Sequence, residues 1–198
     1  MVRGTVIHIR HGETDWNATQ RLQGGQERPL NAVGLAQAAD SGVRLKRLLA
    51  DLGRDASDFT WICSPMQRAR RTMDIVRQEL ALPPGGYLIE ERLREISFGT
   101  LEGLTYEEVE AIDPASMHGI RTDKWHFVPP GGENYVMLTD RVRAGFEATS
   151  GDRIIVAHGG VFRALLGILR GEVDETLAEL TVPQDRFFLW QDGRETWV

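Results

Sequence analysis

The chain of 198 residues contains one cysteine, Cys63, and no long apolar run. A single cysteine excludes an intramolecular disulfide and a metal site built from thiolates. Every apolar run is shorter than the roughly 20 residues that a membrane-spanning helix requires. The first apolar stretch is interrupted by His8 and Arg10, which is unlike a signal peptide. We therefore expect a cytoplasmic protein that makes no contact with a membrane.

Positive charge is also scarce, because the formal net charge is -6 and the pI is about 5.4. An acidic chain binds nucleic acid poorly, so no nucleic-acid partner is expected. An anionic ligand would have to be held by a local group of Arg and His side chains. Several familiar sites are missing too. The chain has no Gly-x4-Gly-Lys-Ser/Thr loop, and its histidines lack the His-Glu-x-x-His spacing of a zinc site.

Apolar segments of strand length alternate with segments of helical period. Strands are expected at 4–9, 59–63, 87–90, 153–157, 186–191 and 195–198. Helices are expected at 33–52, 66–81, 133–149 and 160–170, with a short one near 174–179. Such alternation predicts a single domain over 1–198, folded as a three-layer α/β/α sandwich with a mostly parallel central sheet.

The segment 97–132 breaks this alternation. It is polar, ends in a Pro-Pro-Gly-Gly run, and suggests only one short helix near 105–112. A connection of this length is uncommon unless it serves a site. We therefore expect the segment 97–135 to form a small lid, and expect its residues to shape the pocket for a ligand.

Three predicted strands end in residues that carry chemistry: Arg10-His11-Gly12, Ser64-Pro65 with Arg68 soon after, and His158-Gly159-Gly160. The carboxyl ends of parallel strands meet at one edge of a sheet, where ligands bind. Two imidazoles, two guanidinium groups and open helix N-termini would converge there, a combination suited to phosphate.

This convergence suggests a reaction. A neutral His11 could attack phosphorus, while Arg10, Arg68 and His158 hold the phosphoryl oxygens. The leaving oxygen needs a proton, for which Glu95 is the favoured donor; it would afterwards activate water. Three other glutamates could take the role of proton donor, but each is also plausible as a salt-bridge partner: Glu90, Glu91 and Glu102. A cysteine-based reaction is excluded because Cys63 and Arg68 are separated by four residues and not by five.

Five collinear blocks between residues 10 and 163 resemble the histidine phosphatase superfamily, in its phosphoglycerate-mutase-like branch. They are Arg10-His11-Gly12-Glu13-Thr14 with Asn17 and Arg21-Leu22-Gln23-Gly24; Ser64-Pro65-Met66-Gln67-Arg68; Leu93-Arg94-Glu95-Ile96; Pro130-Gly131-Gly132-Glu133; and Ala157-His158-Gly159-Gly160. One block alone would be a weak motif, whereas five in order are specific. Asn134 departs from the Ser that is more common in the family, but Asn can also cap a helix.

The resemblance implies roles for individual residues. It implies that His11 becomes phosphorylated, that Glu95 donates a proton, and that the phosphate pocket comprises Arg10, Arg68 and His158. It further implies that the phosphate pocket is lined by Asn17, Gln23, Gly24 and Gly159. It also implies that the protein uses neither a metal ion nor an organic cofactor.

The resulting hypothesis is a metal-independent phosphomonoester hydrolase that acts on a small phosphorylated metabolite through a phosphohistidine. The alternative is a cofactor-dependent phosphoglycerate mutase, which needs a second basic cluster. In the short lid segment the main candidates for that cluster are Arg121 and Lys124. An inactive relative that acts only as a binding module is less favoured, because the set of site residues is complete. The oligomeric state and the particular substrate are not predicted.

Overall fold

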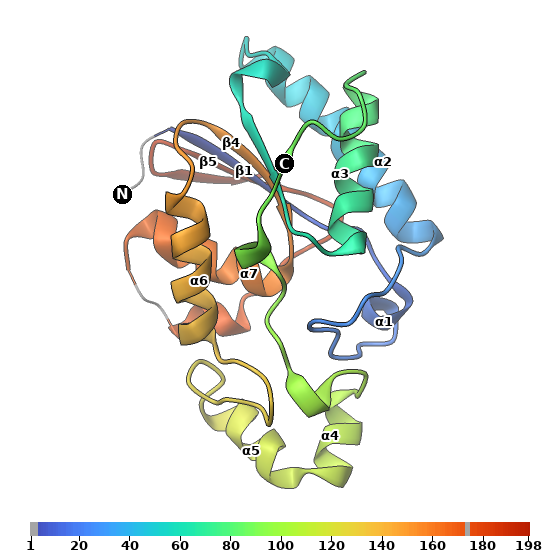
Figure 1. The fold of residues 1–198 in the computed structure, drawn as a ribbon, viewed down its shortest axis with the longest axis vertical. Coiled ribbons are helices and arrows are strands. Elements are labelled where there is room, and N and C mark those ends of the chain that lie inside the picture. The colour runs from blue at the N-terminus through green and yellow to red at the C-terminus, as the bar shows by residue number, and fades with distance from the viewer. Residues whose placement is uncertain (1–3, 173–174) are drawn as a thin grey trace.

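The computed structural model describes residues 4–172 and 175–198, and in them a six-stranded sheet lies between layers of helices (Figure 1). The strands are β1 (Thr5–Arg10), β2 (Thr60–Cys63), β3 (Leu88–Ile89), β4 (Arg153–Ala157), β5 (Phe188–Gln191) and β6 (Arg194–Trp197). Their order is β3-β2-β4-β1-β5-β6. The first four in this order pair in parallel, whereas β5 and β6 are antiparallel. The predicted mostly parallel α/β sandwich is confirmed.

The two faces of the sheet bury two separate apolar cores. Along β1, Val6 belongs to one core, while Ile7 and Ile9 belong to the other, as the two-residue period of a strand requires. The first core is covered by α6 (Tyr135–Glu147) and α7 (Gly159–Arg170), and the second by α2 (Ala32–Asp51) and α3 (Gln67–Glu79) (Figure 1). Because both faces are covered, the parallel strands are apolar along nearly their whole length.

The lid segment differs from the prediction of an irregular chain. Besides α4 (Tyr106–Ile112), it contains a second helix, α5 (Pro114–Thr122), so the prediction is wrong for 114–122. The start signal was present in the sequence: Asp113 accepts a hydrogen bond from the Ser116 N–H, and Pro114 occupies the first turn. These helices surround a small apolar core of Leu22, Leu101, Val109, Met117 and Ile120.

Short elements complete the fold. They are α1 (Asp15–Ala18) and the 3-10 helices η1 (Ala56–Asp58), η2 (Glu91–Leu93), η3 (Gly99–Leu101) and η4 (Glu175–Glu179). The last of these is the short helix expected near 174–179, although residue 174 lies outside the described residues. Asn134 caps α6 by accepting a hydrogen bond from the Met137 N–H, as expected for Asn at this position.

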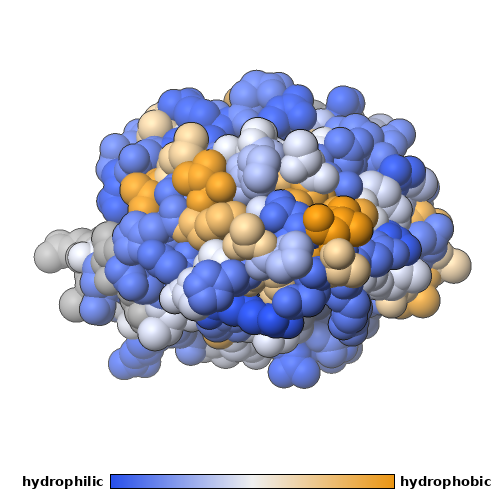
Figure 2. All heavy atoms as spheres, turned by 90° about the horizontal axis from the view of Figure 1, so that it is seen from below, coloured by the Kyte–Doolittle hydropathy of each residue, from blue (hydrophilic) through white to orange (hydrophobic). Residues whose placement is uncertain are grey.

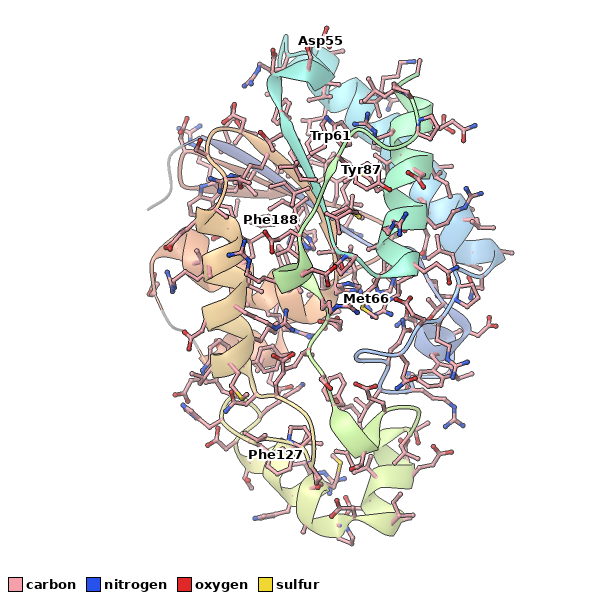
Figure 3. The ribbon with its side chains drawn as sticks, viewed as in Figure 1. Asp55, Trp61, Met66, Tyr87, Phe127 and Phe188 are labelled. Atoms are coloured by element: carbon pink, nitrogen blue, oxygen red, sulfur yellow. The ribbon has the colours of Figure 1, made fainter. Side chains whose placement is uncertain are left out.

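The parallel strands point toward the lid helices. Asp55 precedes β2 and Met66 follows it, and Figure 3 shows Asp55 at the far end of the molecule, Met66 near its middle and Phe127 among the lid helices. The carboxyl-terminal edge of the sheet therefore lies between the two layers of helices and the lid. This is where the residues at the strand ends meet.

The surface at the lid end is mostly hydrophilic. Figure 2, which shows the molecule from this end, has separate apolar patches with hydrophilic residues between them. Exposed apolar side chains of the lid and the following helix include Ile112, Val128 and Met137. In the described part of the chain, no helix is both long and apolar enough to cross a membrane.

Candidate active site

The register of the two central strands brings the two predicted histidines together. Arg10 lies opposite Ala157 in the parallel pair of β1 and β4, so the residues that follow them, His11 and His158, are neighbours. The His11 N–H donates to the Ala157 carbonyl at 2.9 Å, and the two imidazole centroids are 5.1 Å apart. Arg68, the second residue of α3, reaches the same edge after β2.

The hydrogen bonds of His11 define its tautomer. Nδ1 lies 2.8 Å from the Gly12 carbonyl oxygen, which can only accept, so Nδ1 carries the proton. Nε2 then presents a lone pair, and it accepts a hydrogen bond from Arg68 Nε at 3.2 Å. Burial, and then the nearby charges of Arg68 and Arg10, lower the pKa of His11 well below 6.5. The ring is therefore neutral at pH 7, and its free nitrogen is Nε2.

His158 is buried behind this ring. Its Nε2 lies 2.7 Å from Ser64 Oγ, which itself accepts a hydrogen bond from the Met66 N–H. If the Ser64 hydroxyl donates to Nε2, the proton of His158 is on Nδ1. Among the described residues, the buried Nδ1 has no hydrogen-bond partner. Burial, and then the Arg68 charge, lower the pKa of His158 well below 6.5, so a neutral ring could offer one N–H to a ligand.

Arg68 is fully buried and is held by the loop that contains Gln23 and Gly24. Its Nη1 donates to the Gln26 carbonyl at 2.8 Å and its Nη2 to the Gly24 carbonyl at 2.9 Å. With its amide oxygen turned toward the guanidinium, Gln23 accepts from Arg68 Nε at 2.7 Å. Burial lowers the pKa of Arg68 to about 10, which leaves it charged at pH 7. Gln23 and Gly24 thus shape the site largely by holding this cation.

Arg10 is also anchored to backbone, since its Nη1 donates to the Val182 carbonyl. Its buried Nε has no partner in the parts of the chain that the structure describes. A Cβ atom on Gly159 would lie 3.5 Å from this nitrogen, so Arg10 faces the first residue of α7. Burial lowers the pKa of Arg10 to about 10, and the residue remains a cation with a free donor.

Glu95 lies over the N-terminus of α7. Its carboxylate accepts hydrogen bonds from the Ile96 N–H at 2.9 Å and the Gly160 N–H at 3.2 Å. A Cβ atom on Gly160 would come within 2.4 Å of Glu95 Oε1, so a larger residue here would displace the carboxylate from this position. The rival acids serve other contacts: Glu90 pairs with Arg92, Glu91 with Arg94, and Glu102 accepts from the Gly25 and Phe98 N–H groups.

Asn17 completes the predicted set. Its Oδ1 accepts from the Thr14 N–H and from Gln184 Nε2, and Gln184 Nε2 also donates to the His11 carbonyl. No acceptor among the described residues binds Asn17 Nδ2, so this amide can donate to a ligand. Gln184, which sequence reasoning missed, thereby fixes both Asn17 and His11.

These groups enclose a cavity of about 150 Å³. This volume is below the 300–1,000 Å³ of pockets for drug-sized ligands, which favours a small ligand. The cavity is lined by Arg10, His11, Asn17, Arg21, Leu22, Gln23, Gly24, Arg68, Glu95, Ile96, Phe98, Gly159, Gly160 and Arg163. Every predicted site residue except His158 is part of this lining, and His158 lies against His11.

Comparison with known proteins agrees with this geometry. The family model described as histidine phosphatase superfamily (branch 1) matches residues 6–186. The chain belongs to the histidine phosphatase superfamily. The family resemblance of the sequence and the prediction of a phosphatase-type enzyme are thus confirmed at the level of the superfamily.

Relatives of this histidine phosphatase are named for different activities. It is 34% identical over 175 residues to an uncharacterized phosphatase, PhoE, of Bacillus subtilis, an alignment that covers 84% of this chain and 77% of the relative. It is 32% identical to a 2,3-bisphosphoglycerate-dependent phosphoglycerate mutase of Methylobacterium radiotolerans, covering 89% and 84%. The structure of an alpha-ribazole phosphatase from Shigella flexneri has a TM-score of 0.77 and 26% identity, covering 98% of this chain and 94% of that one. Both phosphatases and mutases are therefore among its relatives.

Two cavity residues that could recognise a ligand, Arg21 and Arg163, were missed by sequence reasoning. Arg163 follows His158 by five residues, and helical side chains lean toward the N-terminus, so this spacing could have indicated it. In the lid, Arg121 pairs with Glu110 and Lys124 with Glu179. Neither of these lid cations lines the cavity.

Proposed function

We propose that this histidine phosphatase hydrolyses small phosphomonoesters without a metal ion, through a phosphohistidine at Nε2 of His11. One observation carries the proposal: the neutral His11 ring donates from Nδ1 to the Gly12 carbonyl, which leaves the Nε2 lone pair beside Arg68 in the cavity. An imidazole held in this way is a competent nucleophile, because its attacking nitrogen needs no prior deprotonation.

In the first step, the Nε2 lone pair forms a bond to phosphorus while the bond from phosphorus to the ester oxygen breaks. The protonated carboxyl group of Glu95 gives its proton to the departing oxygen, so the alcohol leaves neutral. That proton can arrive with the substrate, because phosphate monoesters lose their second proton near pH 6. Glu95 is placed for this transfer, since its carboxylate lines the cavity at the N-terminus of α7.

In the second step, water attacks the phosphohistidine and the bond from phosphorus to Nε2 breaks. The Glu95 carboxylate takes a proton from the water, and inorganic phosphate leaves a neutral His11. Through both steps Arg10 Nε, Arg68 and His158 Nδ1 would hold the phosphoryl oxygens, with Asn17 Nδ2 as a further donor. Donors fixed in advance stabilise the charge of the transition state without having to reorganise.

The guanidinium groups take the place that metal ions have in many phosphoryl-transfer sites. Arg10 and Arg68 are held by backbone carbonyls and remain charged. No three His, Cys, Asp or Glu side chains among residues 4–172 and 175–198 are grouped as a metal ion would require. This donor set supports chemistry that proceeds in the presence of a chelator.

A mutase is the second candidate, because one of the relatives is a phosphoglycerate mutase. A mutase must return the phosphoryl group to its substrate, which calls for a second basic cluster at the cavity. The lid cations Arg121 and Lys124 are bound to glutamates instead. We therefore favour the hydrolase, and the absence of 2-phosphoglycerate formation from 3-phosphoglycerate with 2,3-bisphosphoglycerate would support this choice.

The test compares the wild type with His11→Ala on p-nitrophenyl phosphate in EDTA. We expect steady hydrolysis by the wild type and a loss of about 10⁴-fold or more in the variant, because the nucleophile is removed. Quenching in alkaline denaturant should trap the phosphoenzyme of the wild type only, because the P–N bond of a phosphohistidine is stable in base and labile in acid. His118→Ala, an exposed lid position, is the matched control. Turnover by His11→Ala at the wild-type rate would contradict the proposal, and no turnover by the wild type across pH would favour a binding module.

We also propose a small phosphorylated metabolite as the substrate, the cytoplasm as the location, and neither nucleic acid nor membrane as a partner. The net charge of -6 supports the last point, because the cations of the cavity are local exceptions on an acidic chain. Cys63 is buried and unpaired, which fits a reducing compartment.

A further inference from the structure

One cation of the cavity is not required by the proposed reaction. Arg163, on α7, lines the cavity together with Arg10, and both flank the first residue of the helix. A Cβ atom built on Gly159 would lie 3.9 Å from Arg163 Nη1 and 3.5 Å from Arg10 Nε. The guanidinium of Arg163 is therefore adjacent to the phosphate pocket but separate from the side chains that surround His11 Nε2.

The hydrogen bonds of Arg163 leave one edge of its guanidinium open. Its Nε donates to the Leu180 carbonyl at 2.9 Å, and its Nη1 donates to the Tyr135 hydroxyl at 3.0 Å. A guanidinium has five N–H donors, and the remaining ones, on Nη1 and Nη2, have no partner among the described residues. This edge is the planar fork that binds a carboxylate through two parallel hydrogen bonds.

The positive charge of Arg163 also has no counterion among the described residues of the cavity. A dianionic phosphoryl group is matched by Arg10 and Arg68, and Glu95 is neutral when it holds the proton for the leaving group. Arg163 forms no ion pair with any described carboxylate, whereas Arg21, the fourth arginine of the cavity, binds Glu108 through both terminal nitrogens. A half-buried cation without a counterion is unfavourable, so an anion brought by the substrate would complete the site.

We infer that Arg163 binds a carboxylate on the leaving group, and that the enzyme therefore prefers phosphorylated hydroxy acids to phosphorylated alcohols. The cavity of about 150 Å³ favours a carboxylate over a second phosphoryl group, which is larger. This inference rests on the proposed function, because it concerns the far end of the same substrate. It places a single cation at the far end of the substrate, and not the basic cluster that a mutase would require.

The test uses two substrates that differ at one carbon. In 3-phosphoglycerate this carbon is a carboxylate, and in glycerol 3-phosphate it is a hydroxymethyl group. We expect the wild-type kcat/KM for the carboxylate to exceed that for the alcohol by roughly thirtyfold or more. Arg163→Gln should bring this ratio close to one. Arg163→Lys keeps the charge but cannot reproduce both anchoring hydrogen bonds, and it should retain much of the preference.

Arg121→Gln is the matched control, since Arg121 is an exposed arginine that pairs with Glu110 away from the cavity. Its ratio should equal that of the wild type. A ratio near one for the wild type, or an unchanged ratio in Arg163→Gln, would overturn the inference while leaving the phosphatase intact. Loss of the preference in Arg163→Lys to the level of Arg163→Gln would also contradict it, because the role would then be structural. A wild type that hydrolyses neither substrate nor p-nitrophenyl phosphate would refute the proposed function itself.

Discussion

Arg68 Nε donates a hydrogen bond to His11 Nε2 at 3.2 Å, so the cation covers the lone pair that would attack phosphorus. The two outer nitrogens of Arg68 are held by the Gly24 and Gln26 carbonyls. An incoming phosphoryl group therefore meets a guanidinium that is already anchored, and it needs only to take over the Nε–H. The same contact keeps His11 neutral and oriented before substrate arrives.

This arrangement predicts that the Arg68→Lys variant loses most of its phosphatase activity. Lysine keeps the charge, but it cannot bond to His11 and to both loop carbonyls in one plane. We expect kcat/KM for p-nitrophenyl phosphate to fall by about 10²–10³-fold, as for the loss of one preorganised donor. Arg71→Lys changes an exposed arginine on the same helix and should behave as the wild type. Equal activity of Arg68→Lys and the wild type would count against the role of the planar fork.

Glu95→Gln should reveal the proton donor through its dependence on the leaving group. A glutamine can occupy the same place over α7 but cannot release a proton. We expect a loss of about 10²–10⁴-fold for an alkyl phosphate, whose alkoxide must be protonated, and a smaller loss for p-nitrophenyl phosphate. The measurement is kcat/KM for both esters in both proteins, because kcat also includes the second step, in which Glu95 activates water for either ester. Equal losses on the two esters would show that Glu95 acts in some other way.

Glu102 should stabilise both walls of the cavity. Its carboxylate accepts hydrogen bonds from the Gly25 N–H, the Gln26 side chain, the Ser97 hydroxyl and the Phe98 N–H. In Glu102→Gln the negative charge that strengthens these four hydrogen bonds is lost, and the new amide group can no longer accept from Gln26, so we expect a cost of about 1–3 kcal/mol in the free energy of unfolding.

Urea denaturation would measure the effect of Glu102→Gln. Glu91→Gln, which loses only an exposed ion pair with Arg94, should stay within about 0.5 kcal/mol of the wild type. If the two variants lost the same stability, Glu102 would not have the connecting role that its four contacts suggest.

Stability should fall as the pH is lowered, because the buried His8 cannot take up a proton. Burial, and then the Arg10 charge, lower the pKa of His8 from 6.5 to about 3. Above pH 6.5 both the folded and the unfolded chain hold His8 neutral. Below it, only the unfolded chain binds the proton, so the free energy of unfolding decreases by about 1.4 kcal/mol per pH unit until the folded pKa is reached.

His8→Phe removes this titration and keeps an aromatic ring against Phe162, which is 5.0 Å from the imidazole. Urea denaturation at pH 7 and pH 5.5 should give a smaller decrease for this variant than for the wild type. His118→Gln, at an exposed position, should retain the wild-type decrease. An identical pH dependence in His8→Phe and the wild type would show that His8 protonates freely in the folded chain.

Much of this site followed from the sequence because its residues stand next to strong local signals. Arg10 ends an apolar strand and His11 and His158 directly follow one, and parallel strands bring their ends together in any fold of this class. The tautomer of His11 and the anchoring of Arg68 did not follow. They depend on carbonyl groups of Gly12, Gly24 and Gln26, and a sequence does not show where its loops place their carbonyls.

In the lid, too, some features could be read from the sequence and others could not. The Asp113-Pro114 start signal of α5 was present in the sequence, but the helix was missed within a long polar segment. The sequence could not predict which glutamates pair with Arg21, Arg121 and Lys124. The chain offers many acidic residues, and only the folded structure shows which of them lies close to each cation.

The amino-acid sequence by itself determined the succession of strands and helices outside the lid, the family, and the identity of the groups at the strand ends, since these depend on local periodicity and on residue type. Only the tertiary structure decided which cations remain without a counterion, which nitrogen of His11 carries no proton, and that Arg163 rather than Arg121 or Lys124 lines the cavity. Those properties arise from distances between side chains far apart in the chain, and such distances exist only after packing.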